Sequence, residues 1–187
     1  MNIFYLDSNV TKCAEYHNDK HVVKMILEYA QLLSTAHRVL DGTEWTEEKY
    51  VAGSLPPRYR KAKRWKLFDD STDSVLYKAT HINHPSAVWA RQSNNNYNWL
   101  YCLFVSLMSE YTYRYGKTHA CDRLAPYLQR TPKNIPVGYL TQPTPAMPDE
   151  YKVPDSIKSY RNYYIGAKNK MAKWKNRPIP EWWSVAS

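Results

Sequence analysis

The feature that most constrains the fold is a run of helical periodicity from about residue 19 to residue 39. Apolar residues recur there at three- and four-residue spacing and form one face: Val22, Val23, Ile26, Leu27, Ala30 and Leu33. Asn18 or Asp19 is suited to cap the start of this helix, and Gly42 closes the region. Because such a face must be covered, the chain has to build a core around this helix.

The rest of the chain adds further helices and one long loop. Helical patterning extends over about Val10–Tyr16, Ser86–Tyr115 as one or two helices with Gly116 as a stop, Thr118–Gln129, and from an Asp155 cap to about Trp174. Thr131–Pro154 holds six prolines and is expected to be an extended surface loop, and the tail from Arg177 to Trp183 is also extended. Asn2–Leu6 is either a short strand or an extended lead.

The segment after the long helix has weaker signals. Glu47–Tyr50 has some helical character, and Gly53–Pro57 is a loop because Pro56-Pro57 excludes regular structure. Tyr59–Asp70 is basic and receives no assignment, and Asp73–Thr80 is a short helix or irregular. The fold class expected is therefore mainly α, with at most one minor short strand.

Length and composition favour a single domain. The chain has 187 residues and 43% hydrophobic content, enough to bury a real core. We expect one compact helical domain over residues 1–187, with a helical core at about 8–130. The proline-rich loop spans 131–154, and a basic helix and tail span 155–187.

The net charge of +9 is concentrated in two places. Residues 152–177 hold eight Lys or Arg against Asp155 alone, and residues 58–66 hold six with no acid. The 17 Tyr and 7 Trp, against 3 Phe, suit half-wet sites and stacking on bases, although many must simply form the core. Two basic patches indicate a polyanionic partner such as nucleic acid; the alternative is a well-solvated surface.

Several classes of protein are disfavoured. Cys13, Cys102 and Cys121 are odd in number and lack a metal-binding spacing, and no signal peptide or membrane span is visible, which favours a cytosolic protein with free thiols. No Ser-His-Asp order, phosphate-binding loop or dinucleotide-binding glycine motif is present. We expect no cofactor.

The long helix carries an unusual polar stripe opposite its apolar face. It consists of Lys20, His21, Lys24, Glu28, Gln31 and Thr35, and His17 joins it if the helix continues through Asn18. Like charges one turn apart destabilise an isolated helix, so the stripe makes sense around a bound anion near the helix start. His17 or His21 could then act as a general base, Lys20 and Lys24 could hold a phosphate group, and Glu28 could orient Lys24 or a histidine. The alternative is a solvated face with a Lys24–Glu28 ion pair.

Further candidates lie downstream. His81, Asn83 and His84 could join His17 and His21 in a metal site, but carboxylates at ligand spacing are missing, so no metal is expected. On the next helix, Asn96 and Trp99 share a face near Arg91 and Asn95, and the asparagines either contact a base edge or cap a helix break. Arg114 and His119 flank Gly116 and are weaker candidates.

Taken in order, these segments resemble one family across nearly the whole chain. The motifs are His17-x-Asp19-Lys20-His21-Val-Val-Lys24-Met-Ile-Leu-Glu28, His84-Pro85-x3-Trp89-Ala-Arg91 with Asn96-Tyr97-x-Trp99-Leu, Arg114-Tyr-Gly-Lys-x-His119, and Tyr160-Arg161-x-Tyr163-Tyr164 through Trp174-Lys-Asn-Arg177-Pro-x-Pro-Glu-Trp182. The family is that of the bacteriophage amino acid:DNA transferases of thymine hypermodification.

The resemblance implies a reaction. Members act on double-stranded phage DNA in which 5-hydroxymethyluracil has been activated as a pyrophosphate, and the amine of a free amino acid, glycine in the best-understood case, displaces the pyrophosphate. The chain would work in the cytoplasm of an infected bacterium, without a membrane. Because the target base lies inside a duplex, it would flip out.

The same resemblance implies residue roles. Catalytic roles fall to His17, Asp19, Lys20, His21, Lys24 and Glu28. Substrate binding falls to His84, Trp89, Arg91, Asn96, Trp99, Arg114 and His119, with Trp89 or Trp99 stacking on the base and Arg91 or Arg161 holding a carboxylate. DNA binding falls to Lys158, Arg161, Lys168, Lys173, Lys175 and Arg177.

Two other functions remain open. One is a DNA glycosylase or lyase similar to the small helical pyrimidine-dimer glycosylases of phages, with Lys20, Lys24 or the amino terminus forming a Schiff base. The other is a non-enzymatic DNA-binding phage protein.

Overall fold

The computed structural model describes residues 1–53 and 55–186, and in them helices combine with an antiparallel hairpin. The helical elements are α1 (Val10–Tyr16), α2 (Asp19–Asp41), α3 (Asp70–Val75), α4 (Pro85–Ala90), α5 (Asn94–Tyr115), α6 (Ala125–Leu128) and α7 (Ser156–Ala167), with 3-10 turns η1 (Ala120–Leu124), η2 (Asp149–Tyr151), η3 (Asn169–Met171) and η4 (Glu181–Ala186). The strands are β1 (Thr43–Tyr50) and β2 (Tyr59–Lys66).

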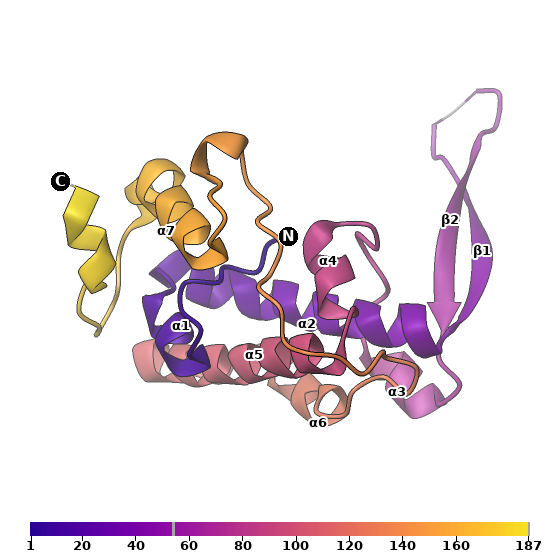
Figure 1. The fold of residues 1–187 in the computed structure, drawn as a ribbon. Helices are drawn as coiled ribbons and strands as arrows, with labels where there is room; N and C mark the ends of the chain where they lie inside the picture. Colours follow the sequence, from indigo (N-terminus) through magenta and orange to yellow (C-terminus); the bar gives the residue numbers. More distant parts are fainter. Residues whose placement is uncertain (54, 187) are drawn as a thin grey trace.

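Helices α2 and α5 lie side by side at the centre of the molecule, and α1 and α4 pack against them (Figure 1). Asn18 starts α2, because its side-chain oxygen accepts a hydrogen bond from the His21 amide at 2.9 Å. The predicted helix at residues 19–39 is thereby confirmed. Gly116, at a φ of 64°, ends α5 in the left-handed conformation that glycine adopts most easily.

The predicted apolar face of α2 is rotated from the observed one. The buried face is formed by Val22, Met25, Ile26, Tyr29, Leu32, Leu33 and Ala36. Val23 and Leu27, which the prediction placed in the core, are 43% and 39% exposed. The reason is that apolar residues cover more than half of this helix, so that spacing alone does not fix which of them face inward.

The mainly α prediction is wrong, because β1 and β2 form an eight-residue antiparallel ladder in which Glu47 faces Ala62. The chain is mixed α/β, although helix still predominates in one compact domain. Residues 47–50, expected to be helical, are part of β1. Both faces of this hairpin are largely exposed, so the alternation of apolar and polar residues that reveals a half-buried strand is missing from its sequence.

Arg38 fixes the base of the hairpin to α2. Its guanidinium donates to the Trp65 carbonyl at 2.9 Å and to the Asp73 carboxylate at 2.6 Å. Gly42 suits this junction, because a Cβ there would lie 2.5 Å from the Arg38 carbonyl oxygen of α2 and 3.2 Å from the Lys66 carbonyl oxygen of β2. The hairpin therefore leaves the end of α2 in a defined direction.

Other boundaries differ from the predictions in smaller ways. Residues 2–6 form no strand; Ile3 to Leu6 are buried as an extended lead. The Ser86–Tyr115 region is two helices, α4 and α5, as one of the two predicted forms had it. The expected helix at 118–129 is the short pair η1 and α6, the last helix ends at Ala167 rather than Trp174, and the extended tail contains η4.

Candidate functional site

His17 and His21 lie at the junction of α1 and α2, but they have different surroundings. His17 is fully buried. Its Nδ1 donates to the Cys13 carbonyl at 2.7 Å, and its Nε2 accepts from the Tyr29 hydroxyl at 3.0 Å. That hydroxyl in turn accepts the Phe4 amide at 3.2 Å, which fixes the direction of the whole chain of bonds. Both ring nitrogens of His17 are therefore engaged in holding the fold.

His21 keeps one ring nitrogen available. Its Nδ1 lies 2.5 Å from the Tyr164 hydroxyl, and its ring stacks on Phe4 with centroids 4.2 Å apart. Within the described residues no hydrogen bond engages its Nε2, and the side chain is 5% exposed. Of the two histidines considered from the sequence, His21 is therefore the one that has a ring nitrogen without a hydrogen bond in the described residues.

Both histidines are held neutral. Burial lowers the pKa of His17 to about 4, and burial, followed by the neighbouring His17 and then Lys168 and Lys24, lowers the pKa of His21 to about 3. Burial also raises the pKa of Tyr164 well above its ordinary value, so that its phenol stays protonated. Since a hydroxyl can donate or accept, Tyr164 permits either tautomer of His21, and Nε2 can present a lone pair or a proton.

The polar stripe of α2 is partly solvated and partly buried. Lys20 is exposed, and Lys24 is 68% exposed with its ammonium 3.1 Å from the Glu28 carboxylate. Thr35, in contrast, is buried. The ion pair predicted as the alternative is thus present, yet Lys24 also lies close enough to His21 to lower its pKa. Lys24 is a cation at the edge of the His21 site.

The start of α2 does not offer free backbone donors to an anion in the way that the sequence suggested. The Asn18 side chain takes the His21 amide, and the Asp19 amide donates to the Lys173 carbonyl at 2.8 Å. The Asp19 carboxylate adds a negative charge to the same turn. Positive charge for an anionic ligand therefore has to come from side chains and not from this helix terminus.

Asp19 belongs to a buried charge network with Arg114. The Arg114 guanidinium donates to Asp19 at 2.9 Å and to Glu110 at 2.6 Å, and Arg177 donates to Glu110 at 2.8 Å. The Asp19 carboxylate also accepts the Lys175 amide at 2.8 Å. Three residues assigned to catalysis, substrate or DNA therefore tie the tail to α2 and α5. Glu110 was missed, although its four-residue spacing from Arg114 on one helix was a readable signal.

Trp89, Asn96 and Trp99 hold neighbouring segments together. The Trp89 indole donates to the Thr141 hydroxyl at 3.0 Å, the Asn96 carbonyl oxygen accepts the Thr141 amide at 2.9 Å, and the Trp99 indole donates to the Ser8 carbonyl at 3.1 Å. All three side chains are buried. The proline-rich loop is thereby fastened to α4 and α5, and neither indole face lies open to a base.

The remaining substrate-binding candidates sit at helix ends. His84 caps α4 by accepting the Ser86 amide at 3.2 Å, and His119 caps η1 by accepting the Cys121 amide at 3.1 Å. Arg91 donates to the Ala87 carbonyl at 2.9 Å and is half-buried. All three side chains thus form local hydrogen bonds at the ends of their helices.

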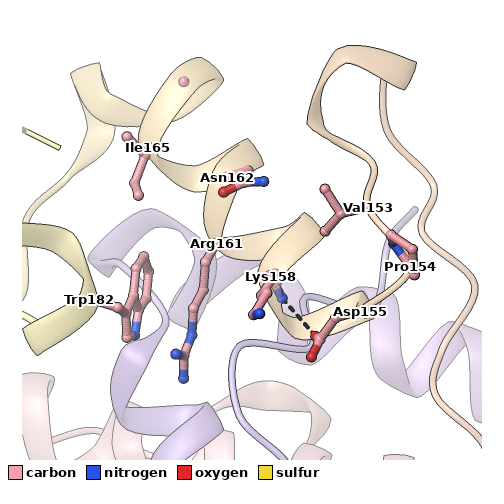
Figure 2. Close-up of a pocket in the computed structure, with 9 residues that line it drawn as sticks. Val153, Pro154, Asp155, Lys158, Arg161, Asn162, Ile165 and Trp182 are labelled. Atoms are coloured by element: carbon pink, nitrogen blue, oxygen red, sulfur yellow. Dashed lines mark hydrogen bonds between the residues drawn. The ribbon is translucent and has the colours of Figure 1, made fainter. Parts of the chain in front are cut away.

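A groove of about 940 Å³ runs along α7 (Figure 2). Its lining includes Lys158, Arg161, Asn162, Ile165 and Trp182. Figure 2 shows the Arg161 and Trp182 side chains lying next to each other, and the guanidinium carbon lies 5.3 Å from the centre of a Trp182 ring. Arg161 is further held by the Leu6 carbonyl at 2.9 Å. Lys158 is exposed at the groove and leaves its ammonium for an outside partner.

The other DNA-binding candidates are held to different degrees. Lys173 is exposed, Lys168 lies 4.8 Å from the ring centre of Tyr163, and Lys175 lies 5.2 Å from that of Tyr115. Arg177 is committed to Glu110 and lies over the Tyr113 ring. Of these candidates, Lys158, Lys173 and Lys175 are exposed to a polyanion, and Lys168 is half-buried.

In the described residues, His, Cys, Asp and Glu form no group of three or more that could hold a metal ion. Nor does any helix in those residues have the length and apolar content needed to cross a bilayer. Comparison of the chain with family models, curated proteins and solved structures finds no match to any of them.

Proposed function

We propose that this protein is a DNA-modifying transferase. It attaches an amino acid, glycine first among the candidates, through the amine to the 5-methylene carbon of pyrophosphorylated 5-hydroxymethyluracil in DNA. The observation that carries the proposal is the environment of His21. It is a neutral histidine with one available ring nitrogen. The cations Lys24 and Lys168 lie near its ring and act on its pKa.

The chemistry balances with these groups. A C–N bond forms between the amine and the methylene carbon, the C–O bond breaks, and pyrophosphate leaves with the electron pair. The amine loses one proton, which His21 Nε2 is placed to accept because the ring is neutral. Lys24 and Lys168 would hold the leaving group, and its negative charge would raise the pKa of His21 by the same coulombic effect through which the lysines lower it.

The α7 groove supports a large polyanionic substrate. Lys158 lies at the groove, and Lys168 and Lys173 follow along the chain, so that cations run from the groove toward the His21 end of α2. The planar Arg161 guanidinium, which lies over the Trp182 ring at the groove, provides a surface on which a base can stack. Phosphates held by these cations would position the duplex, whereas the flipped base would reach His21.

The test is a transfer assay. The protein is incubated with DNA that contains pyrophosphorylated 5-hydroxymethyluracil and with single amino acids, and the DNA is digested to nucleosides for mass spectrometry. We expect a nucleoside heavier by one amino-acid residue attached through nitrogen, together with released pyrophosphate. If no amino acid adds mass to the nucleoside, the proposal fails.

Two variants connect the assay to the site. Lys24→Ala removes an exposed ion pair, so it should change the free energy of unfolding by only about 0–1 kcal/mol while reducing turnover. His21→Asn keeps an acceptor for Tyr164 and removes the ring nitrogen available to substrate, so turnover should fall by about 10²–10⁴-fold. Lys117→Ala, an exposed change elsewhere, is the control. Full activity in both site variants would exclude this assignment.

One observation favours a second candidate, a DNA glycosylase or lyase. The Glu28 carboxylate lies beside two amines, Lys24 at 3.1 Å and the amino group of Met1 at 3.7 Å. A Schiff-base mechanism needs an amine nucleophile with an acidic partner of this kind. Borohydride would trap a covalent adduct between this protein and DNA if the lyase reaction occurs, whereas the transferase should give no trapped adduct.

A further inference from the structure

The β1–β2 hairpin stands clear of the rest of the molecule (Figure 1). Residues 43–66 hold seven Lys or Arg and three Glu, a balance of +4. The glutamates are all paired within the hairpin: Glu44 with Lys63 at 2.8 Å, Glu48 with Lys61 at 3.4 Å, and Glu47 with Arg64 at 2.7 Å. The hairpin thus carries an excess of positive charge beyond its internal ion pairs.

The outer part of the hairpin is exposed in a way that core packing does not explain. Tyr59 is 63% exposed and Leu55, in the connecting loop, is 91% exposed. Arg60 is exposed and has no ion-pair partner among the described residues. A two-stranded ribbon with cations and aromatic residues on its surface has the dimensions that a DNA groove accepts.

The position of the hairpin relates it to the candidate site. Helix α2 has 23 residues from Asp19 to Asp41, which corresponds to a length of about 34 Å. His21 lies at its first turn, and the hairpin leaves its other end. One turn of B-DNA also measures about 34–36 Å. In Figure 1 the hairpin and α7 rise from the same side of the α2–α5 layer, at opposite ends of it.

We propose that the β1–β2 hairpin is a second DNA-binding element, which contacts the duplex about one helical turn away from the base held at the His21 end. It acts as a positioning arm, and binding at two points one turn apart fixes one face of the duplex toward the protein. This inference rests on the proposed function only in taking duplex DNA as the partner.

The experiment uses unmodified DNA, so that it is independent of the transfer reaction. Binding is measured on a 24-base-pair duplex and on a stem of eight base pairs closed by a loop, which at about 27 Å is too short to reach both elements. The hairpin variant is Lys49→Gln with Arg60→Gln and Lys61→Gln. The matched control removes three exposed cations elsewhere, as Lys12→Gln with Lys117→Gln and Lys133→Gln.

The hairpin variant should bind the 24-base-pair duplex about tenfold more weakly, with the salt dependence of binding reduced by about two to three phosphate contacts. On the short stem its affinity should stay within about twofold of the parent, and the control should lose less than the hairpin variant on the long duplex. In the opposite direction, Glu44→Gln with Glu48→Gln should tighten binding to the long duplex, because it removes the carboxylates paired with Lys63 and Lys61 and leaves both ammonium groups for phosphates.

Several results would overturn the inference. One is an equal loss on both DNAs, and another is a loss on the long duplex no larger than that of the control. A third concerns sedimentation without DNA: if the parent protein is a dimer and the hairpin variant is a monomer, the hairpin is a contact between two copies of the chain. If the length-dependent loss is found but no amino acid is transferred in the assay above, the hairpin is still a DNA-binding element, whereas the transferase proposal is excluded.

Discussion

The two ends of α2 use charged and aromatic residues in opposite ways. At the amino end, the buried side chains of Arg114 and Glu110 form an ion pair that the partly buried Asp19 joins, and His17 and His21 are buried among tyrosines. At the carboxyl end, the hairpin carries its lysines and arginines on exposed faces. Residue type alone therefore does not separate structural from functional roles, because burial decides which cations are held in internal ion pairs and which are exposed to an outside partner.

The largest expected effect breaks the buried network. Arg114→Met leaves the buried Glu110 carboxylate with Arg177 as its remaining partner and takes the guanidinium away from the partly buried Asp19, so the free energy of unfolding should fall by about 3 kcal/mol. Denaturant unfolding followed by circular dichroism measures it, with Lys117→Met as the exposed control. If Arg114→Met unfolds like the parent protein, the two ends of α2 do not differ in the way described.

The next effect is a dependence of stability on pH. The folded-state pKa values of His17 and His21, about 4 and about 3, lie below the unfolded value near 6.5. The unfolded chain therefore binds more protons, and the stability these histidines contribute is present above pH 6.5 and is lost as pH falls toward 4 and then 3. Between pH 7 and 5 the loss should be on the order of 3 kcal/mol. In His21→Asn the slope of stability against pH should be shallower; an unchanged slope would contradict the prediction.

A smaller effect tests the hydrogen-bond chain through Tyr29. Tyr29→Phe removes the donor to His17 Nε2 and the acceptor of the Phe4 amide, while the ring remains in place. We expect a loss of about 1–3 kcal/mol in thermal or denaturant unfolding, because two buried groups lose a partner. Tyr59→Phe, on the exposed hairpin, should change stability by no more than about 0.5 kcal/mol. Equal losses of stability in Tyr29→Phe and Tyr59→Phe would contradict the difference between the two ends of α2.

The smallest expected effect concerns Gly42, at the junction between α2 and the hairpin. Gly42→Ala places a methyl group 2.5 Å from the Arg38 carbonyl oxygen at the end of α2 and 3.2 Å from the Lys66 carbonyl oxygen of β2, so the junction between α2 and the hairpin has to shift. Global stability should fall by about 1 kcal/mol, because the hairpin can yield as a unit. Hydrogen exchange should show faster exchange of the β1 and β2 amides than of the α2 amides. Uniform exchange across all three elements would mean that the hairpin and the body unfold together.

Part of this arrangement could be predicted from local sequence. The Asn18 cap of α2, the Gly116 stop after α5 and the extended proline-rich loop each depend on residues within a few positions of one another. Such short-range signals set the limits of elements. The hairpin was not predicted because both faces of its strands are largely exposed and carry charged residues such as Glu47 and Arg64, so its sequence shows no alternation of apolar and polar residues.

The candidate site could be predicted only in outline. The sequence placed the histidines and lysines of α2 at the centre and left open which histidine could act as a base. The geometry singles out His21, because both ring nitrogens of His17 are bonded. It also moved Asp19, Arg114 and Arg177 from expected contacts with substrate or DNA to a network that holds the tail.

By itself, the sequence determined that α2 exists, that it begins at Asn18 or Asp19 and that histidines and lysines cluster near its start, since these depend on local hydrogen bonds and helical spacing. The tertiary structure decided which of those side chains remain available. The deciding contacts join distant positions, His21 with Tyr164 and Asp19 with Arg114. Burial and the pairing of charges depend on such long-range neighbours, and periodicity along the chain carries no record of them.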